Sequence, residues 1–175
     1  MKEVSTVKAL TSSVAVVLTI ALCSLAYGIH ETQVDGTKIP EPGADPAKLY
    51  RYINLPKPYA QRWTVWREKG KMYAGKEPHG SFLTTYLNKE ALDSLKAGKV
   101  MADGSVIVQE NYGTDRKLES LMVAYKIKGY SAETGDWFCA KYGPMDGYVF
   151  ESGEASSCSK CHRENRIDDY FVNRK

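Results

Sequence analysis

The motif Cys158-Ser-Lys-Cys161-His162 constrains this chain more than any other stretch of its sequence. Residues three and four positions apart are neighbours on a helix surface, so one helical turn can present both thiols and the imidazole together. Only 13 residues follow His162, and none of them is Met or His. Any further group that works with the motif must therefore come from upstream. The fold has to bring residues that are distant in sequence to this C-terminal segment.

Three kinds of site use such a motif. A structural zinc site needs four ligands, but there is no second Cys-x-x-Cys, and the other histidines, His30 and His79, are isolated in sequence. A thioredoxin-like dithiol lies near the start of a βαβ unit, whereas this motif is C-terminal. Haem attachment needs only two thiols and one histidine. We therefore favour one covalent haem c on Cys158 and Cys161, with His162 as the proximal iron ligand.

The N-terminal residues 1–29 have the composition of an export signal. Lys2 and Lys8 precede a stretch, residues 9–29, that is largely apolar and has no charged side chain. A small-x-small cleavage site at residues 24–26 completes the pattern of a signal peptide. The uncharged stretch is also long enough to span a bilayer, so a retained anchor is the alternative. Both interpretations place the rest of the chain in the periplasm or another extracytoplasmic compartment, either soluble or anchored.

Five of the seven prolines fall between residues 30 and 58. This concentration predicts an extended spacer with one helical turn in the segment DPAKLYRYI. We therefore divide the chain into an export or anchor segment at 1–29, a Pro-rich linker at 30–58 and one folded domain at 59–175. The net charge of +3 is small, and no run of Lys or Arg alternates with aromatic residues, which argues against a nucleic-acid partner.

The folded domain has the pattern of a β-dominated α+β structure. Aromatic and β-branched residues predict strands at 81–88, 105–112, 120–128, 136–143 and 147–151. An apolar stripe between Asn88 as N-cap and Gly98 as C-cap predicts a helix after the first strand. The expected architecture is an antiparallel sheet of four or five strands with one crossing helix and a C-terminal haem-binding helix.

Four stretches, in order, resemble the cytochrome P-460 family, which includes cytochrome c′-beta: PHGSFLTTYLN, MADGSVIVQENY, VAYKIKGYSAETGDWFCAKYG and CSKCHRENRIDDYF. The resemblance spans residues 60–172. It implies a β-rich homodimer with a c-type haem, a five-coordinate iron and an open distal side. Members of the family either oxidise hydroxylamine with a haem cross-linked to a lysine, or bind nitric oxide in an apolar pocket without that cross-link.

The resemblance also locates the residues that separate these two activities. The cross-linking lysine of the family ends the strand after an Asp-Gly turn, where this chain has Gln109 in DGSVIVQE. A distal carboxylate aligns with Ala124, and a distal arginine of some members aligns with Leu83. General acid–base chemistry needs a titratable group, and none of these three residues supplies one, so the prediction shifts towards gas binding. Phe82 is a further candidate for the distal wall.

Alternation along the strand at 105–112 leaves open which of its faces meets the haem. Ile107 shares a face with Gln109, and Val108 shares the other face with Glu110, so both faces carry an apolar residue. Glu110 would replace the missing distal carboxylate only if the register slipped by one residue.

Four other residues have simpler interpretations. We interpret His79 in PHG as a turn residue bonded to the backbone rather than a distal ligand. Cys139 is expected to be a small buried side chain. Lys126 and Lys128 are expected to lie on a solvated strand face rather than to cross-link a haem.

The sequence therefore predicts an exported monohaem c-type cytochrome that binds nitric oxide or a similar small ligand at a five-coordinate iron. Two alternatives stay open: a hydroxylamine-oxidising enzyme, and an electron-transfer cytochrome tethered to a membrane complex through residues 9–29. If the protein is an enzyme, we expect an oxidoreductase acting on hydroxylamine or nitric oxide. The expected partners are the small ligand, a redox protein and a second copy of the chain.

Overall fold

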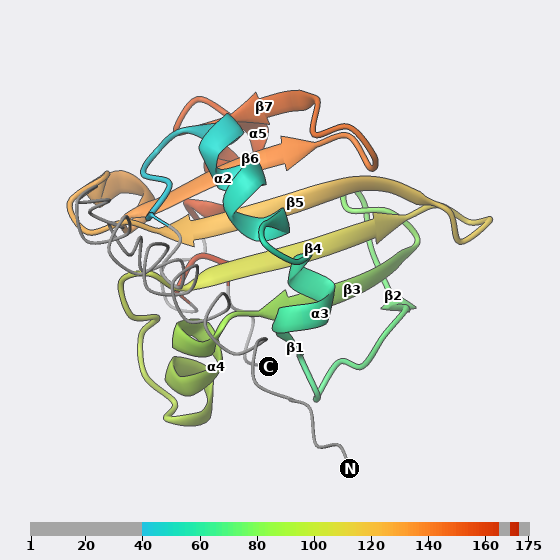
Figure 1. Cartoon of the computed structure of the whole chain (residues 1–175), viewed down its shortest axis with the longest axis horizontal. Helices are drawn as coiled ribbons and strands as arrows, with labels where there is room; N and C mark the ends of the chain where they lie inside the picture. Colours follow the sequence, from blue (N-terminus) through green and yellow to red (C-terminus); the bar gives the residue numbers. More distant parts are fainter. Residues whose placement is uncertain (1–39, 165–168, 172–175) are drawn as a thin grey trace, which may run out of the picture. The chain divides into compact units, whose positions relative to one another are not determined.

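The computed structural model describes residues 40–164 and 169–171 (Figure 1). Its helices are α2 (Pro46–Asn54), α3 (Tyr59–Arg62), α4 (Lys89–Lys96) and α5 (Ser157–His162), with a 3-10 turn, η1, at Ala132–Thr134. Its strands are β1 (Thr64–Val65), β2 (Tyr73–Ala74), β3 (Phe82–Leu87), β4 (Val106–Tyr112), β5 (Leu118–Lys126), β6 (Trp137–Tyr142) and β7 (Val149–Ser152). The predicted export or anchor segment, residues 1–29, lies outside the described residues. Within the described ranges, no helix is long and apolar enough to cross a membrane.

One antiparallel sheet organises the domain, in the order β1-β3-β4-β5-β6-β7, with β2 also paired to β3. In this order β4 and β5 are the two central strands. They pair from Val106 opposite Tyr125 to Asn111 opposite Ser120. The predicted β-dominated α+β fold is confirmed, and all five predicted strands form. Strands β1 and β2 were not predicted, because two residues are too few to show an alternating pattern.

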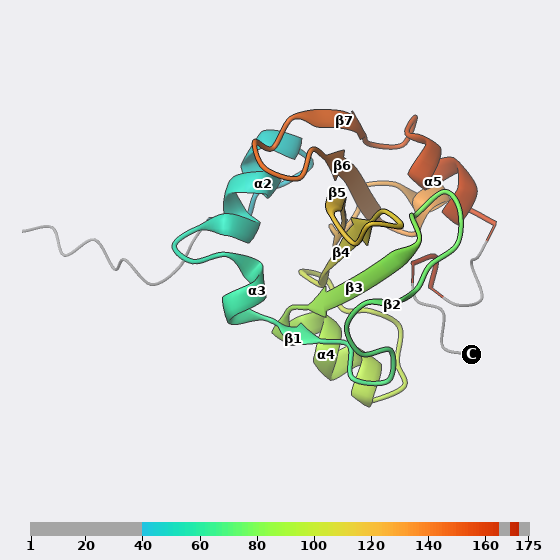
Figure 2. The ribbon, with the colours of Figure 1, turned by 90° about the vertical axis from the view of Figure 1, so that its right-hand side faces the viewer.

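Helices α2 and α3 cover one face of the sheet. Figure 1 shows them in front of the strands, and Figure 2 shows α5 on the opposite side. Leu49 and Ile53 of α2 are fully buried in a cluster with Val106, Val108 and other side chains of the central strands. Burying an apolar side chain of this size stabilises the fold by about 1.5–3 kcal/mol.

The helical turn predicted within the linker forms as α2, and residues 46–54 pack against the sheet rather than forming an extended spacer. Asp45 caps α2 by accepting a hydrogen bond from the Lys48 amide at 3.0 Å, and Pro46 occupies the first turn. Proline is favoured there because its fixed φ suits a helix start and its missing N–H would have no partner. The prolines thus mark a helix boundary as well as a change in composition.

Helix α4 and the C-terminal residues lie on the other face. The predicted N-cap is confirmed, because the Asn88 side chain accepts a hydrogen bond from the Ala91 amide at 3.0 Å. Gly98, at φ +63°, follows the last helical turn. Ala91 packs with Ile107, Trp137 and other apolar side chains in a second buried cluster. The sheet is therefore covered on both faces, and the second face carries the site described below.

A buried ion pair anchors the chain after α5. Lys126 Nζ donates to Asp169 Oδ1 at 2.9 Å, and both residues are under 10% exposed. The Met101 amide donates to Asp169 Oδ2 at 2.6 Å, and Trp137 Nε1 lies 3.3 Å from Asp169 Oδ1. The prediction of a solvated Lys126 is therefore wrong, because its partner comes from 43 residues downstream. Lys128 is exposed, as expected.

Candidate functional site

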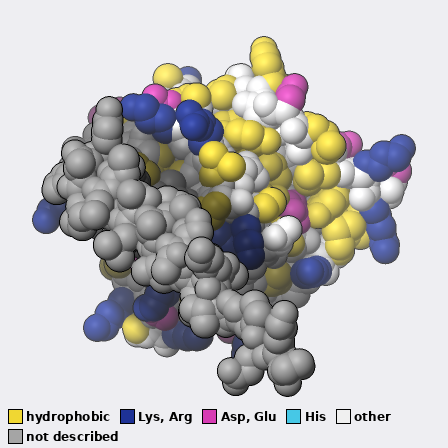
Figure 3. All heavy atoms as spheres, in the orientation of Figure 1, with side chains coloured by type: hydrophobic (Ala, Val, Ile, Leu, Met, Phe, Trp, Pro, Cys, Tyr) yellow, Lys and Arg dark blue, Asp and Glu magenta, His cyan; other side chains and the backbone are white. Residues whose placement is uncertain are grey.

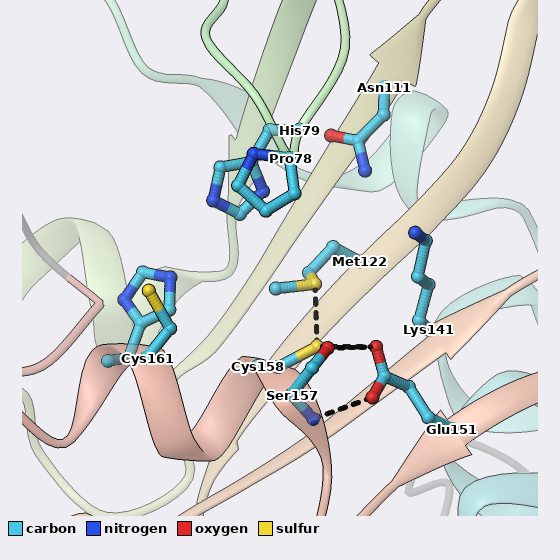
Figure 4. Close-up of a pocket in the computed structure, with 10 residues that line it drawn as sticks. Pro78, His79, Asn111, Met122, Lys141, Glu151, Ser157, Cys158 and Cys161 are labelled. Carbon is cyan, nitrogen blue, oxygen red and sulfur yellow. Dashed lines mark hydrogen bonds between the residues drawn. The ribbon is translucent and has the colours of Figure 1, made fainter.

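Helix α5 presents Cys158, Cys161 and His162 to one cavity of about 190 Å³ (Figure 4). Ser156 caps this helix, since its Oγ accepts a hydrogen bond from the Ser159 amide at 3.2 Å. The rest of the cavity is lined by Pro78, His79, Asn111, Met122, Lys141, Glu151 and Ser157. The structure thus brings residues from β4, β5, β6, β7 and the loop before β3 to the motif helix.

The His162 imidazole is held in one tautomer. Its Nδ1 lies 2.8 Å from the carbonyl oxygen of Tyr170. A carbonyl can only accept, so Nδ1 carries a proton, and in the neutral ring the lone pair is on Nε2. The ring also stacks on Phe171, with centroids 4.3 Å apart and planes 16° apart. A histidine that ligates a metal is commonly oriented by such a bond from its other nitrogen.

The residues that fix His162 are themselves anchored. Asp169 is held by the buried ion pair with Lys126, and Tyr170 follows directly in the chain. The ring of Tyr170 lies against Gly135, where a Cβ would overlap it. The side chains around Asp169 therefore hold the Tyr170 carbonyl in place and, through it, the imidazole.

Cys139 supports α5 from the sheet. Its side chain is fully buried, as predicted, and its Sγ lies 2.8 Å from Ser159 Oγ and 3.2 Å from Ser156 Oγ. A hydrogen bond from the neighbouring Cys158 thiol lowers the pKa of Cys139 to about 7. Cys158 in turn lies 3.3 Å, sulfur to sulfur, from Met122. Cys139 therefore packs beneath the motif and is not one of the residues that line the cavity.

Gln109 lies on the face of β4 that carries the cavity, but it does not line the cavity itself. Its Nε2 donates to Asn111 Oδ1 at 2.9 Å, and Asn111 Nδ2 donates to Ser120 Oγ at 3.1 Å. Asn111 is the cavity-lining member of this chain of hydrogen bonds. Sequence reasoning missed Asn111, although the two-residue alternation from Gln109 places it on the same face.

The other predicted distal residues are buried near the cavity or face away from it. Leu83 pairs with Asn111 across the sheet, and Ala124 pairs with Ile107, so both lie on the cavity face without lining the cavity. Ala124 belongs to the cluster around Trp137. Phe82 lies on the opposite face, where the Arg116 guanidinium is 5.0 Å from its ring centroid.

Carboxylates near the cavity are tied to other groups. Glu110 faces the opposite side of the sheet and accepts hydrogen bonds from Tyr59 Oη at 2.8 Å and Tyr112 Oη at 2.6 Å. Glu151 lines the cavity, but it accepts from the Ser157 amide at 2.7 Å and the Ser157 hydroxyl at 2.6 Å. Burial raises the pKa of Glu151, but the hydrogen bonds from Ser157 outweigh it and keep that pKa below its usual value. Glu151 thus stabilises the start of α5 as an ionised acceptor.

His79 faces His162 across the cavity. Their ring centroids are 5.8 Å apart, with an interplanar angle of 59°. The backbone interpretation holds, because the His79 amide donates to the Lys76 carbonyl at 2.9 Å in a turn. The imidazole, however, makes no hydrogen bond to any described residue. Burial, then the charges of His162 and Lys141, lower the pKa of His79, which favours the neutral ring.

The model of the Cytochrome P460 family matches residues 56–172, which is more than half of the chain. The chain belongs to the cytochrome P460 family. The resemblance seen in the sequence is thereby confirmed, and as a family member this protein is a haem-binding cytochrome. The matched range contains every residue that lines the cavity. No curated protein matches the chain.

The cavity of this cytochrome P460 family member has the donors that a haem requires. Two thiols and one oriented imidazole meet in a single cavity. The tautomer fixed by Tyr170 leaves the lone pair of Nε2 available to ligate a metal ion. The thioether of Met122 and the ring of Pro78 add apolar surface for a flat macrocycle. These residues fit the cofactor that the family implies.

Proposed function

We propose that this protein is an exported monohaem c-type cytochrome that binds nitric oxide or a similar small, uncharged ligand. The thiols of Cys158 and Cys161 would hold one haem c by adding across its two vinyl groups. The imidazole of His162 would provide the proximal nitrogen. When bound, the haem supplies an iron centre that takes up electrons and small ligands. The single observation that carries the cofactor assignment is the Tyr170–His162 hydrogen bond beside both thiols.

Ligand binding is favoured over proton-coupled oxidation by the hydrogen bonds on the sheet side of the cavity. Gln109, Asn111 and Ser120 form a chain of neutral side chains there. Amides and hydroxyls do not exchange protons readily at neutral pH, so they are poor general acids or bases. The carboxylate of Glu151 is already engaged by Ser157. These residues can therefore orient a small polar ligand, and they offer it no free proton relay.

A hydroxylamine-oxidising enzyme with a cross-linked haem is the second candidate. It is favoured by Lys141, a lysine that lines the cavity from β6. This lysine stands opposite Met122 and Glu151 in the sheet, not at position 109, where the family resemblance expects the cross-linking residue. The protein would then be an oxidoreductase acting on a nitrogenous substrate.

Spectroscopy and mass spectrometry of the purified full chain distinguish these functions. We expect an ordinary c-type ferrous spectrum, a ferrous nitrosyl adduct on addition of nitric oxide, and haem peptides with thioether links alone. A third link on the haem peptide, at Lys141, would establish the cross-linked enzyme instead. Exchanging both Cys158 and Cys161 for Ser should abolish covalent haem on a denaturing gel.

We further propose an extracytoplasmic location and a homodimer. The location rests on the composition of residues 1–29, and fractionation of cells that express the full chain tests it. The dimer rests on the family resemblance and on exposed apolar side chains, which Figure 3 shows gathered on the visible face. Taken over all the described residues, whichever face they lie on, the exposed large hydrophobic side chains are Leu55, Val100, Met145, Tyr148 and Phe150. A monomeric mass in solution would contradict the dimer.

A further inference from the structure

We propose that a second cavity, next to the thiol-lined one, receives the propionate groups of the haem, and that the Lys141 ammonium is their counter-ion. The inference rests on the haem site proposed above and deepens it. It states which way the cofactor lies in the protein and which side chain tunes its reduction potential. The contact is an ion pair, so it forms without breaking a covalent bond and without transfer of an electron.

The second cavity adjoins the first and lies away from the motif helix. Its volume is about 200 Å³, and it shares four lining residues with the first cavity: Pro78, His79, Asn111 and Lys141. Four further residues line the second cavity alone: Gly80, Glu119, Ser120 and Phe150. Each cavity by itself is smaller than the about 300–1,000 Å³ typical of ligand pockets, whereas the two together reach that range. A haem attached at α5 therefore extends into the second cavity.

The positions of the two thiols decide which end of the haem enters the second cavity. A haem carries its two vinyl groups on one side of the ring and its two propionates on the opposite side. In the proposed site the vinyl groups join Cys158 and Cys161, which line only the first cavity. The propionates therefore point away from α5, toward the cavity that no residue of α5 lines.

Lys141 is placed to neutralise a carboxylate where the two cavities meet. It lines both of them, and no other Lys or Arg of the described chain lines either one. Its ammonium makes no ion pair with a described carboxylate. Figure 4 shows its side chain extending away from the Glu151 carboxylate and toward Asn111. Burying a carboxylate without an opposite charge is costly, so this ammonium favours a carboxylate ligand.

A chain of hydrogen bonds on β4 and β5 ends in a second donor at the same place. Gln109 Nε2 donates to Asn111 Oδ1 at 2.9 Å, and Asn111 Nδ2 donates to Ser120 Oγ at 3.1 Å. Ser120 accepts from this chain and donates to no described residue, so its hydroxyl proton is available for an acceptor. Because Ser120 lines the second cavity and not the first, the chain offers its last donor to the propionates.

The other titratable side chains around the two cavities leave Lys141 to the ligand. Glu151 accepts from the amide and the hydroxyl of Ser157, at 2.7 and 2.6 Å. Glu119 is exposed, and its carboxylate lies against Gly113 in the turn between β4 and β5. Burial and neighbouring positive charge lower the pKa of His79 and favour its neutral ring. The positive charge of Lys141 is therefore not matched by a described partner in either cavity.

The first test compares the reduction potential of the full-length holoprotein with those of Lys141→Gln, Lys141→Arg and Lys160→Gln. Lys160 is the matched control, because it is an exposed lysine of α5 and its removal changes the net charge equally. At a fixed solution potential, the ratio of ferrous to ferric protein should fall by about fivefold in Lys141→Gln, since an unpaired propionate favours ferric iron. The ratio should stay within about twofold of wild type in Lys141→Arg, which keeps the charge, and in Lys160→Gln, whose charge is screened. Equal ratios in Lys141→Gln and Lys160→Gln would overturn the assignment.

Resonance Raman spectroscopy shows whether Lys141 acts through the propionates. The propionate bending band follows the hydrogen bonds that the carboxylates accept, so it should shift in Lys141→Gln and keep its position in Lys160→Gln. A changed potential without a shift of this band would reject the contact and leave only a general electrostatic effect. An unchanged band together with weaker binding of added azide in Lys141→Gln would assign Lys141 to ligand binding instead.

If Lys141→Gln does not mature, the wild-type holoprotein decides the question. A water-soluble carbodiimide joins an amine to a carboxylate in contact with it and takes up the water that is lost. After this treatment, the haem peptide should carry the β6 segment linked through Lys141. A link to Lys160 instead, or to no lysine, would overturn the assignment. A link between Lys141 and the haem before treatment would establish the cross-linked enzyme and reject the ion pair.

The outcomes separate this inference from the proposed function. A holoprotein that forms the nitrosyl adduct, but whose potential and propionate band do not depend on Lys141, keeps the function and rejects the contact. A holoprotein in which both depend on Lys141, but which forms no nitrosyl adduct, does the reverse. A chain that attaches no haem rejects both.

Discussion

His162 and His79 face the same cavity, but His162 is held by its side chain and His79 by its backbone. The side chain of His162 is fixed by the Tyr170 carbonyl and by stacking on Phe171. The side chain of His79 has neither kind of support, and only its backbone is pinned to β4 through Gly80 and Ser81. A side chain that is held at its imidazole keeps one orientation, whereas one that is held only at its main chain can rotate about its side-chain bonds. One side of the cavity therefore carries an oriented imidazole, and the other carries an imidazole whose orientation is not fixed by a hydrogen bond to a described residue.

The largest effect is expected from removing the buried ion pair between Lys126 and Asp169, which supports the Tyr170 carbonyl next to His162. Asp169→Ala leaves the Lys126 ammonium buried without its partner, and we expect a loss of about 3–5 kcal/mol in the free energy of unfolding. Urea unfolding of the holoprotein measures it. Lys128→Ala is the matched control, since Lys128 is exposed on the same segment, and its effect should stay within about 0.5 kcal/mol. Equal effects of the two substitutions would contradict the anchoring role.

The His79 side is tested by Gly80→Ala. The new Cβ would lie 2.9 Å from the Tyr112 carbonyl oxygen at φ +101°, so we expect a loss of about 1–3 kcal/mol in the free energy of unfolding, measured by urea unfolding. Gly98→Ala is the control, because Gly98 also has a positive φ but has no atom within 4 Å of its Cβ position. It should cost about 1–2 kcal/mol, for the positive φ alone. A loss in Gly98→Ala as large as the loss in Gly80→Ala would show that the close approach to Tyr112 adds nothing.

The smallest effect is expected at the start of α5. Ser156→Ala removes the cap of the helix and should lower the free energy of unfolding by about 1 kcal/mol. Ser131→Ala offers a comparison, since Ser131 precedes η1 without a capping hydrogen bond from its side chain. Thermal unfolding of both variants should show a shift for Ser156→Ala alone. No shift in either would mean that the sheet, rather than the cap, fixes the start of α5.

The sequence predicted the parts of this molecule that depend on local pattern. The five longer strands, the Asn88 cap of α4 and the motif helix follow from alternation, capping residues and spacing. A helical turn was predicted where α2 forms, but the prolines around it were interpreted as a spacer outside the folded domain. The packing of Leu49 and Ile53 against the sheet is a contact between distant residues, and composition does not reveal it.

The parts that were not predicted depend on contacts between distant residues. Lys126 was expected in solvent, because nothing near it in sequence indicates that Asp169 returns to neutralise it. His79 was interpreted as a turn residue, which describes its backbone and says nothing about where its ring lies. Asn111 was missed because the family resemblance drew attention to Gln109, two residues earlier on the same face. Each of these side chains takes its place from the tertiary structure.

The position of the Tyr170 carbonyl has a consequence for damage to the protein. The two thiols and His162 all precede Tyr170 in the chain. A protein cut between the motif and Tyr170 would keep these three side chains and would lose the acceptor that fixes the imidazole. With the proposed haem bound, covalent attachment would survive such a cut, whereas the orientation of His162 would not.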